Sequence, residues 1–258
     1  MDIRLDDKFF IVTGASSGFG EAIARKLIAE GASVLAVARS SEKLEKLKVD
    51  CGSKLETMIQ DVTADNFPER LVDRINGRIP SGMVVNAGGP PSGGFFDTSP
   101  ESWIKAYNDL VSWKVKILSK LVPLFIQAGY GRIVMIESVS VKQPVDGLIL
   151  SNTFRPAIVG MARTLATEIA GFGITINILA PGYHETAAMQ RLFIRKSNEL
   201  GISLDDARRQ FIADTGMGKM GNPVDFAELA VWLLSPSSGF ITGQVISVAG
   251  NLVKGILG

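Results

Sequence analysis

Disulfides, long hydrophobic runs and a strong charge of either sign are all missing from this sequence of 258 residues. Cys51 is the only cysteine, so no intramolecular disulfide can form, which fits a reducing cytoplasm. Gly, Pro or charged residues interrupt every apolar run before it reaches the roughly 18 residues of a membrane helix. The net charge of +1, without a long basic run, gives no sign of nucleic-acid binding. We therefore expect a cytoplasmic protein whose core needs no disulfide or metal, with no metal site, no nucleic-acid partner and no membrane span.

Short β-branched runs that alternate with helical stretches are the main pattern of the chain. Most runs are apolar throughout, as expected for strands covered on both faces. The alternation predicts right-handed crossovers and a Rossmann-type, doubly wound α/β fold with a parallel sheet of about seven strands. No repeat or linker divides the chain, so we expect one domain over residues 1–258. The expected strands are Phe9–Val12, Val34–Val37, Leu55–Ile59, Met83–Val85, Ile133–Ile136, Thr175–Leu179 and Val245–Val248.

A glycine-rich segment, Thr13–Gly20, directly follows the first expected strand and precedes the first expected helix. Glycine allows positive φ and a close backbone approach to a ligand, and a helix N-terminus attracts a pyrophosphate. The spacing is Gly-x3-Gly-x-Gly rather than Gly-x-Gly-x-x-Gly, and an ordinary glycine-rich turn is the alternative. The place between strand and helix favours cofactor binding. The candidate residues are Gly14, Ser16, Ser17, Gly18, Phe19 and Gly20.

Five segments in the right order resemble those of the short-chain dehydrogenase/reductase family. They are the glycine-rich segment, the Asp-Val after the third strand, the Asn-Ala-Gly after the fourth, the Pro-Gly loop with a Thr beyond it, and Ile241-Thr242-Gly243 before the last strand. The resemblance covers almost the whole chain and implies this family's fold and a nicotinamide dinucleotide cofactor. The cofactor contacts that it implies are Asp61, Val62, Asn86, Ala87, Gly88, Pro181, Gly182 and Thr186.

The end of the second strand indicates which dinucleotide is bound. A carboxylate there would bind the ribose 2′-hydroxyl and repel a 2′-phosphate, but Ala38 stands at this place and Arg39 follows. Arginine suits a phosphate through its fork of donors, and a solvated arginine is the alternative. The family often has a second basic residue in the glycine loop, where Ser16 and Ser17 stand here. We expect NADP(H), and NAD(H) as the second choice.

The catalytic positions depart from the family's pattern, which is a Ser, a Tyr that donates or takes the proton, a Lys four residues later and a helical Asn. Ser138 matches the Ser, but Ser151 stands at the Tyr position and Arg155 at the Lys position. A serine hydroxyl has a pKa far above the roughly 10 of tyrosine. Arginine can bind ribose hydroxyls but cannot relay a proton. The resemblance places the Asn near Leu110 or Val111, where none stands, and we expect Asn108 to face elsewhere.

Three other groups are candidates for the missing proton donor. Lys142 follows Ser138 by four residues, on the loop that would border the substrate, and a solvated loop lysine is the alternative. Tyr183 and His184 follow the Pro-Gly loop, and His184 is of a suitable type for proton transfer near pH 7. Lone histidines are usually not catalytic, so a structural role is the alternative for His184.

A helical segment at about 187–220 lies outside the alternation of strands and helices, and we expect it to form a lid over the substrate. Its Arg191 and Arg195 could meet an acidic substrate or form a solvated helix face. The two long helices expected at about 101–128 and 151–171 carry more apolar surface than one sheet face needs. In the family such helices pack against copies of themselves, so we expect a homotetramer.

We interpret the chain as an NADP(H)-dependent short-chain oxidoreductase, similar to 3-oxoacyl reductases. It would move a hydride to or from a small-molecule carbonyl or alcohol with unusual acid–base residues, namely Ser138, Ser151, Arg155 and Lys142. The main alternative is a cofactor-binding sensor or assembly partner with little or no catalysis. A lyase or epimerase on the same fold is a third interpretation.

Overall fold

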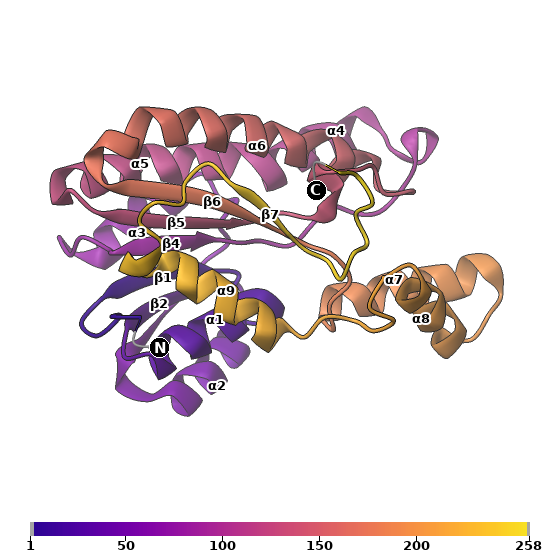
Figure 1. Cartoon of the computed structure of the whole chain (residues 1–258), viewed down its shortest axis with the longest axis horizontal. Helices are drawn as coiled ribbons and strands as arrows, with labels where there is room; N and C mark the ends of the chain where they lie inside the picture. Colours follow the sequence, from indigo (N-terminus) through magenta and orange to yellow (C-terminus); the bar gives the residue numbers. More distant parts are fainter. Residues whose placement is uncertain (1–2, 257–258) are drawn as a thin grey trace.

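One parallel sheet between two layers of helices makes up the body of the computed structural model, which describes residues 3–256 (Figure 1). The first two and last two residues of the expected domain lie outside the described residues. The strand order is β3-β2-β1-β4-β5-β6-β7, so the direction of winding reverses between β1 and β4. All seven expected strands are present. They are β1 Phe9–Thr13, β2 Ser33–Ala38, β3 Leu55–Ile59, β4 Gly82–Val85, β5 Gly131–Ile136, β6 Ile174–Pro181 and β7 Val245–Val248.

The sheet has a hydrophobic core on each face, as its nearly continuous apolar strands predict. Residues of α3, α5 and α6 pack on one face and residues of α1, α2 and α9 on the other. Successive strand residues point to opposite faces, so Ile11 joins the first core and Phe10 the second. The helices are α1 Gly18–Ala29, α2 Ser41–Cys51, α3 Phe67–Ile75, α4 Pro100–Tyr107, α5 Trp113–Ala128, α6 Ile149–Ile169, α7 Ala187–Leu200, α8 Leu204–Ala213 and α9 Pro223–Leu234.

The helix expected at about 101–128 is interrupted by a π-helical turn at Asn108–Ser112, between α4 and α5. The indole N–H of Trp113 donates to the Asp109 carbonyl oxygen at 2.9 Å beside this turn. A π turn holds one residue more than an α turn, so it changes which residues of α5 face the sheet. Lys114, one residue into α5, is among the side chains turned inward and is fully buried.

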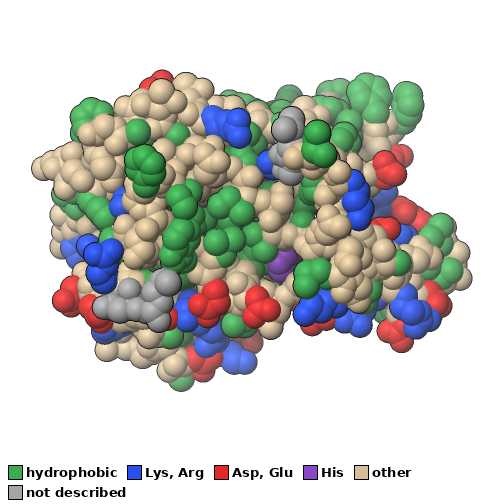
Figure 2. Space-filling view, in the orientation of Figure 1, with side chains coloured by type: hydrophobic (Ala, Val, Ile, Leu, Met, Phe, Trp, Pro, Cys, Tyr) green, Lys and Arg blue, Asp and Glu red, His purple; other side chains and the backbone are tan. Residues whose placement is uncertain are grey.

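The α7–α8 segment projects from the body, beyond the carboxyl ends of the strands (Figure 1). It has a small hydrophobic cluster of its own around Met189, Phe193 and Met220. Lysine, arginine and acidic side chains crowd its surface, whereas hydrophobic side chains gather above it in the view, at the corner near α4 (Figure 2). None of the helices within residues 3–256 has both the length and the hydropathy of a membrane span.

Candidate active site

The loop between β1 and α1 has the backbone conformation that its glycines predict. Gly14 has φ +63°, in the left-handed region. A Cβ atom on Gly20 would lie 2.3 Å from the carbonyl oxygen of Gly14, so only glycine lets α1 begin this close to the loop. Ser17 precedes α1, and its side chain makes no capping hydrogen bond. The first N–H groups of α1 are therefore not capped by this side chain, as a phosphate site requires.

Asn86 fastens the end of β4 to this loop. Its N–H donates to the Thr13 hydroxyl oxygen at 2.9 Å, and the hydroxyl donates to the Asn86 carbonyl oxygen at 2.8 Å. The Asn86 side-chain amide donates to the Thr13 carbonyl oxygen at 3.3 Å. Asn86 therefore holds two strand ends together, next to the point where the winding reverses.

A cleft of about 540 Å³ lies at the carboxyl ends of the strands, where open α/β sheets bind ligands. Three residues expected at the cofactor do not line it: Gly20, Pro181 and Gly182. Gly20 packs against the glycine loop, and the Gly182 N–H donates to the Val248 carbonyl oxygen at 3.0 Å, so both serve close packing. The expected residues that do line the cleft are Gly14, Ser16, Ser17, Gly18, Phe19, Arg39, Asp61, Val62, Asn86, Ala87, Gly88, Arg155 and Thr186.

Two basic residues stand at one end of this cleft. The Arg39 side chain is 80% exposed and lies 3.7 Å from an Asp61 carboxylate oxygen. Lys43 also lines the cleft, on the first turn of α2, where the Ser40 hydroxyl oxygen accepts from the Lys43 N–H at 3.4 Å. Lys43 was not among the residues expected from the sequence. Its spacing of four residues from Arg39, across the Ser40 cap, is the signal that could have revealed it.

Hydrogen bonds within its own loop favour the ionised form of Asp61. Burial opposes its ionisation, but the Thr63 N–H and hydroxyl donate to one carboxylate oxygen at 3.0 and 2.8 Å. Together with the positive charges of Arg39 and Lys105, these bonds outweigh burial and lower the pKa of the Asp61 carboxyl below its usual value. Asp61 is therefore a fixed, ionised acceptor at the wall of the cleft.

The positions expected for catalysis lie directly after β5 and on α6. Ser138 follows β5, and its hydroxyl oxygen accepts from the Ser140 N–H at 3.2 Å. Ser151 and Arg155 lie one turn apart on α6, and both are buried. A Cβ atom on Gly89 would lie 3.2 Å from Nη2 of Arg155, which places the guanidinium against this loop. Arg155 lines the cleft, whereas Ser138 and Ser151 are not among its lining residues.

Behind Arg155 lies a buried ionic cluster that the sequence analysis missed. Arg155 Nη1 donates to Glu137 Oε2 at 2.9 Å, and Lys114 Nζ donates to Glu137 Oε1. The Glu137 side chain is fully buried, and burial lowers the pKa of Lys114 below the usual value of lysine, although Glu137 opposes this. The available signal was charge beside apolar core positions: Lys114 directly after the core residue Trp113, and Glu137 directly after a buried strand.

His184 and Tyr183 are held in aromatic contacts and are not part of the cleft lining. The His184 ring lies 5.1 Å from the Phe19 ring and 5.5 Å from the Phe226 ring, centroid to centroid. Burial lowers the pKa of His184, so the imidazole is neutral at neutral pH. The Tyr183 ring packs edge-on against Phe211, and burial raises the pKa of Tyr183. Neither lines the cleft, and their surroundings favour structural roles.

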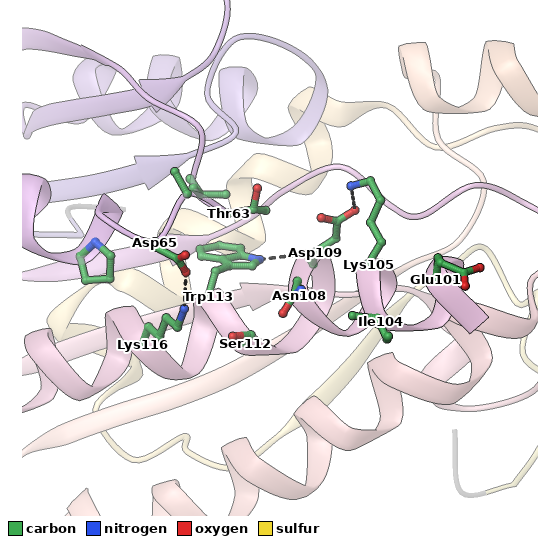
Figure 3. A pocket seen from close by; sticks show the side chains of 13 residues that line it. Thr63, Asp65, Glu101, Ile104, Lys105, Asn108, Asp109, Ser112, Trp113 and Lys116 are labelled. Carbon is green, nitrogen blue, oxygen red and sulfur yellow. Dashed lines mark hydrogen bonds and ion pairs between the residues drawn. The ribbon is translucent and has the colours of Figure 1, made fainter. Parts of the chain in front are cut away.

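Lys142 and Asn108 also lie outside the cleft lining. Lys142 follows the short helical turn Val139–Val141 after Ser138 and is half-buried. Asn108 lines a neighbouring cavity of about 480 Å³ between the loop after β3 and the start of α5 (Figure 3). This cavity is bordered by the ion pair of Lys105 Nζ and Asp109 Oδ2, 2.6 Å apart. It touches neither the glycine loop nor the buried cluster, so the larger cleft is the candidate active site.

The first turn of α7 closes one side of the cleft. Thr186 precedes α7, and a Cβ atom on Gly18 would lie 3.6 Å from its methyl group. Arg191 lines the cleft, whereas Arg195 pairs with Glu199 on the same helix. Within residues 3–256, no group of three or more His, Cys, Asp or Glu side chains is placed to hold a metal ion.

Sequence and structure comparisons place this architecture among known enzymes. A family sequence model described as "Enoyl-(Acyl carrier protein) reductase" matches residues 14–251. The 3-oxoacyl-(acyl-carrier-protein) reductase FabG of Thermotoga maritima is 29% identical over 257 residues, which cover 97% of this chain and all of that protein. Dehydrogenase/reductase SDR family member 4 of Oryctolagus cuniculus is 30% identical, over 96% of this chain and 94% of that protein.

Comparison with solved structures leads to the same group of enzymes. The L-sorbose reductase of Gluconobacter frateurii, complexed with NADPH and L-sorbose, has a TM-score of 0.92 at 25% identity and covers 99% of this chain and 100% of that chain. A variant actinorhodin polyketide ketoreductase with NADPH has a TM-score of 0.91 at 28% identity, covering 96% of this chain and 98% of that chain. The strand order, the glycine loop and these similarities over nearly the whole length lead to one conclusion: the chain belongs to the short-chain dehydrogenase/reductase family of oxidoreductases.

Proposed function

We propose that this protein is an NADP(H)-dependent oxidoreductase that moves a hydride between NADP(H) and a carbonyl or alcohol, similar to the 3-oxoacyl reductases. The observation that carries the proposal is the lining of the cleft. It contains the glycine loop, the basic pair Arg39 and Lys43, and Arg155. Arg39 and Lys43 offer positive charge where a 2′-phosphate would need it. Several relatives are named 3-oxoacyl reductases, and NADPH is bound in the two solved structures described above.

The cleft fits an extended dinucleotide along its length. We assign the adenine to Asp61 and Val62, the 2′-phosphate to Arg39 with Lys43, and the pyrophosphate to the N–H groups around Ser16–Phe19 at the start of α1. The nicotinamide end would meet residues 86–88, Arg155 and Thr186. Pro181 and Gly182 would not contact the dinucleotide. They would fix the position of the loop that carries Thr186. Bound NADPH supplies the hydride.

The residues that remain for acid–base work act without the usual tyrosine. The Ser138 hydroxyl would donate to the substrate oxygen, and Arg155 would stabilise negative charge near the reacting oxygen by its fixed positive charge. Ser151 can donate a hydrogen bond but is a weak acid. Lys142 is the candidate for the proton itself, because it is tethered to the turn that Ser138 begins. We expect slow carbonyl reduction by this set.

The chain would act as one domain, in the cytoplasm, with α7 and α8 as a lid over the substrate and four copies in the assembly. The lid proposal is supported by the place of Thr186 and Arg191 at the cleft and by the separate small core of the segment. Apolar side chains exposed on α4 and α5, including Ile104, Tyr107 and Val115, support the assembly.

A panel of carbonyl substrates tests the function. The purified protein is mixed with NADPH and 3-oxoacyl thioesters, ketoses or simple ketones, and the loss of NADPH absorbance is followed. We expect turnover on at least one class, lowered about 10²-fold or more by Ser138→Ala. Binding of NADPH without turnover on any carbonyl, or on any alcohol with NADP⁺, would contradict the proposed reaction and favour a sensor or assembly role.

A further inference from the structure

Three ionisable side chains from three separate elements meet in the interior, next to the cleft. Lys114 comes from α5, Glu137 from the residue after β5, and Arg155 from α6. The side chains of Lys114 and Glu137 are 2% and 0% exposed, and that of Arg155 is 10% exposed. Removing charges from water is costly, and a hydrophobic replacement of such a cluster is often at least as stable. Stability alone is therefore a weak explanation for this cluster.

Glu137 is the centre of the cluster, because its two carboxylate oxygens face different partners. Oε2 accepts from Arg155 Nη1 at 2.9 Å, and Oε1 accepts from Lys114 Nζ. With both oxygens engaged, the carboxylate is fixed from two sides. The contact with Nη1 in turn fixes one corner of the guanidinium group.

The rest of the Arg155 guanidinium is directed away from Glu137. Its Nη2 atom lies against Gly89, in the loop that lines the cleft. Its Nε atom is buried and has no hydrogen-bond partner among the described residues. A guanidinium whose Nη2 lies against the cleft wall is suited to a ligand that brings acceptors, such as ribose hydroxyls.

We propose that Glu137 and Lys114 are positioning residues that hold Arg155 at the nicotinamide-ribose end of the cleft. This inference rests on the proposed NADP(H)-binding function. Lys114 fixes Glu137, and Glu137 fixes Arg155. Glu137 and Arg155 both line the cleft, and Arg155 is the member of the cluster that carries donors for the ribose hydroxyls. A buried chain of three residues thereby orients the cation at the ribose end of the cleft.

The test is a double-mutant cycle on NADPH affinity, which needs no catalysis. NADPH is titrated into the wild type, Glu137→Gln, Arg155→Met and the double variant, and its fluorescence gives each Kd. We expect Glu137→Gln to weaken NADPH binding about tenfold in the wild-type background, but less than about twofold when Arg155 is already methionine. A residue that only supports the fold would weaken binding equally in both backgrounds.

Controls separate this inference from folding and from the proposed function. Lys116→Met removes an exposed lysine from the same helix and should leave the Kd unchanged. If Glu137→Gln does not fold, Lys114→Met with Glu137→Gln removes both partners of the buried Lys114–Glu137 contact together and is placed in the same cycle. Equal losses in both backgrounds, or no loss in either, would overturn the positioning role. Failure of the wild type to bind NADPH would instead overturn the proposed function.

Discussion

At the scale of single residues, Ser151 and Arg155 decide how this site departs from its family. They lie one turn apart on a buried face of α6, and only Arg155 reaches the lining of the cleft. A serine hydroxyl does not extend as far as a tyrosine hydroxyl and is a much weaker acid. The loss of a positioned general acid typically costs about 10²- to 10⁴-fold in rate.

Restoring the missing groups should therefore raise activity. Ser151→Tyr with Arg155→Lys rebuilds an acid of usable pKa beside a cation, and Glu137 remains as a partner for the new ammonium group. We expect carbonyl reduction to rise about 10²-fold, measured by steady-state loss of NADPH absorbance. The control is Thr153→Tyr with Arg155→Lys, because Thr153 is exposed on another face of α6. A fall in turnover would show that another donor is in use, and Lys142→Ala would be made next.

Lys114 predicts an unusual pH dependence of stability. Burial lowers its pKa in the folded protein, Glu137 raises it in part and Arg155 lowers it further, whereas the unfolded lysine titrates near 10.5. Between these two pKa values the unfolded state binds the extra proton, so the free energy of unfolding rises with pH, by up to about 1.4 kcal/mol per pH unit.

Urea denaturation between pH 7 and about 9 measures this effect, below the range in which tyrosine ionisation acts in the opposite direction. The rise should be present in the wild type and absent in Lys114→Met. Cys51→Ala should be used as the common background, because burial raises the pKa of that thiol and its ionisation lowers stability at higher pH. Identical slopes with and without Lys114 would show that this lysine does not titrate differently on folding.

At the scale of elements, the two helices α7 and α8 are the segment most suited to move. Their hydrophobic cluster is small and separate from the two cores of the sheet. The start of α7 borders the cleft, from Thr186 before the helix to Arg191 in its second turn, so a ligand in the cleft would tie the segment to the body. We expect saturating NADPH to slow amide hydrogen exchange in α7 and α8 about tenfold.

Hydrogen exchange measured by mass spectrometry, with and without NADPH, tests this protection of α7 and α8. Peptides of α3 are the internal reference, because α3 does not line the cleft. Protection confined to the glycine loop, with α7 and α8 unchanged, would contradict the lid.

The elements also show what the sequence could and could not predict. The strands and the glycine loop were predictable because their signals are local: apolar runs, and glycines between a strand and a helix. The cluster behind Arg155 was not, because its hydrogen bonds join residues 23 and 18 positions apart in the chain. Likewise, nothing local in the sequence indicates that His184 packs against both Phe19 and Phe226. The π turn also escaped prediction, since it keeps the helical pattern while changing the face of α5.

At the scale of the whole molecule, apolar side chains remain exposed at the corner formed by α4 and the loop before it (Figure 2). Phe96 is 97% exposed and Ile104 64%, while Tyr107 packs edge-on against Phe154. An apolar surface of this kind indicates contact with another protein surface, and closed symmetric assembly is the usual outcome for identical chains.

Light scattering should therefore give the mass of four 27.6 kDa chains at micromolar concentration. Ile104→Glu with Tyr107→Glu should lower the measured mass, because two buried carboxylates would oppose association. Ile194→Glu, on the exposed side of α7, is the matched control and should leave the mass unchanged. A monomer for the wild type would remove the assembly proposal.

The cleft and its preference for NADP(H) are the centre of this account, and paired calorimetric titrations test them most directly. NADPH and NADH are titrated into the wild type, Arg39→Ala, Lys43→Ala and, as a control on the same helix as Lys43, Lys48→Ala. We predict that the wild type binds NADPH at least about tenfold more tightly than NADH. Arg39→Ala and Lys43→Ala should each weaken NADPH about tenfold and change NADH less than about twofold, with Lys48→Ala unchanged. Tighter binding of NADH by the wild type, or unaltered NADPH affinity in both variants, would contradict the account.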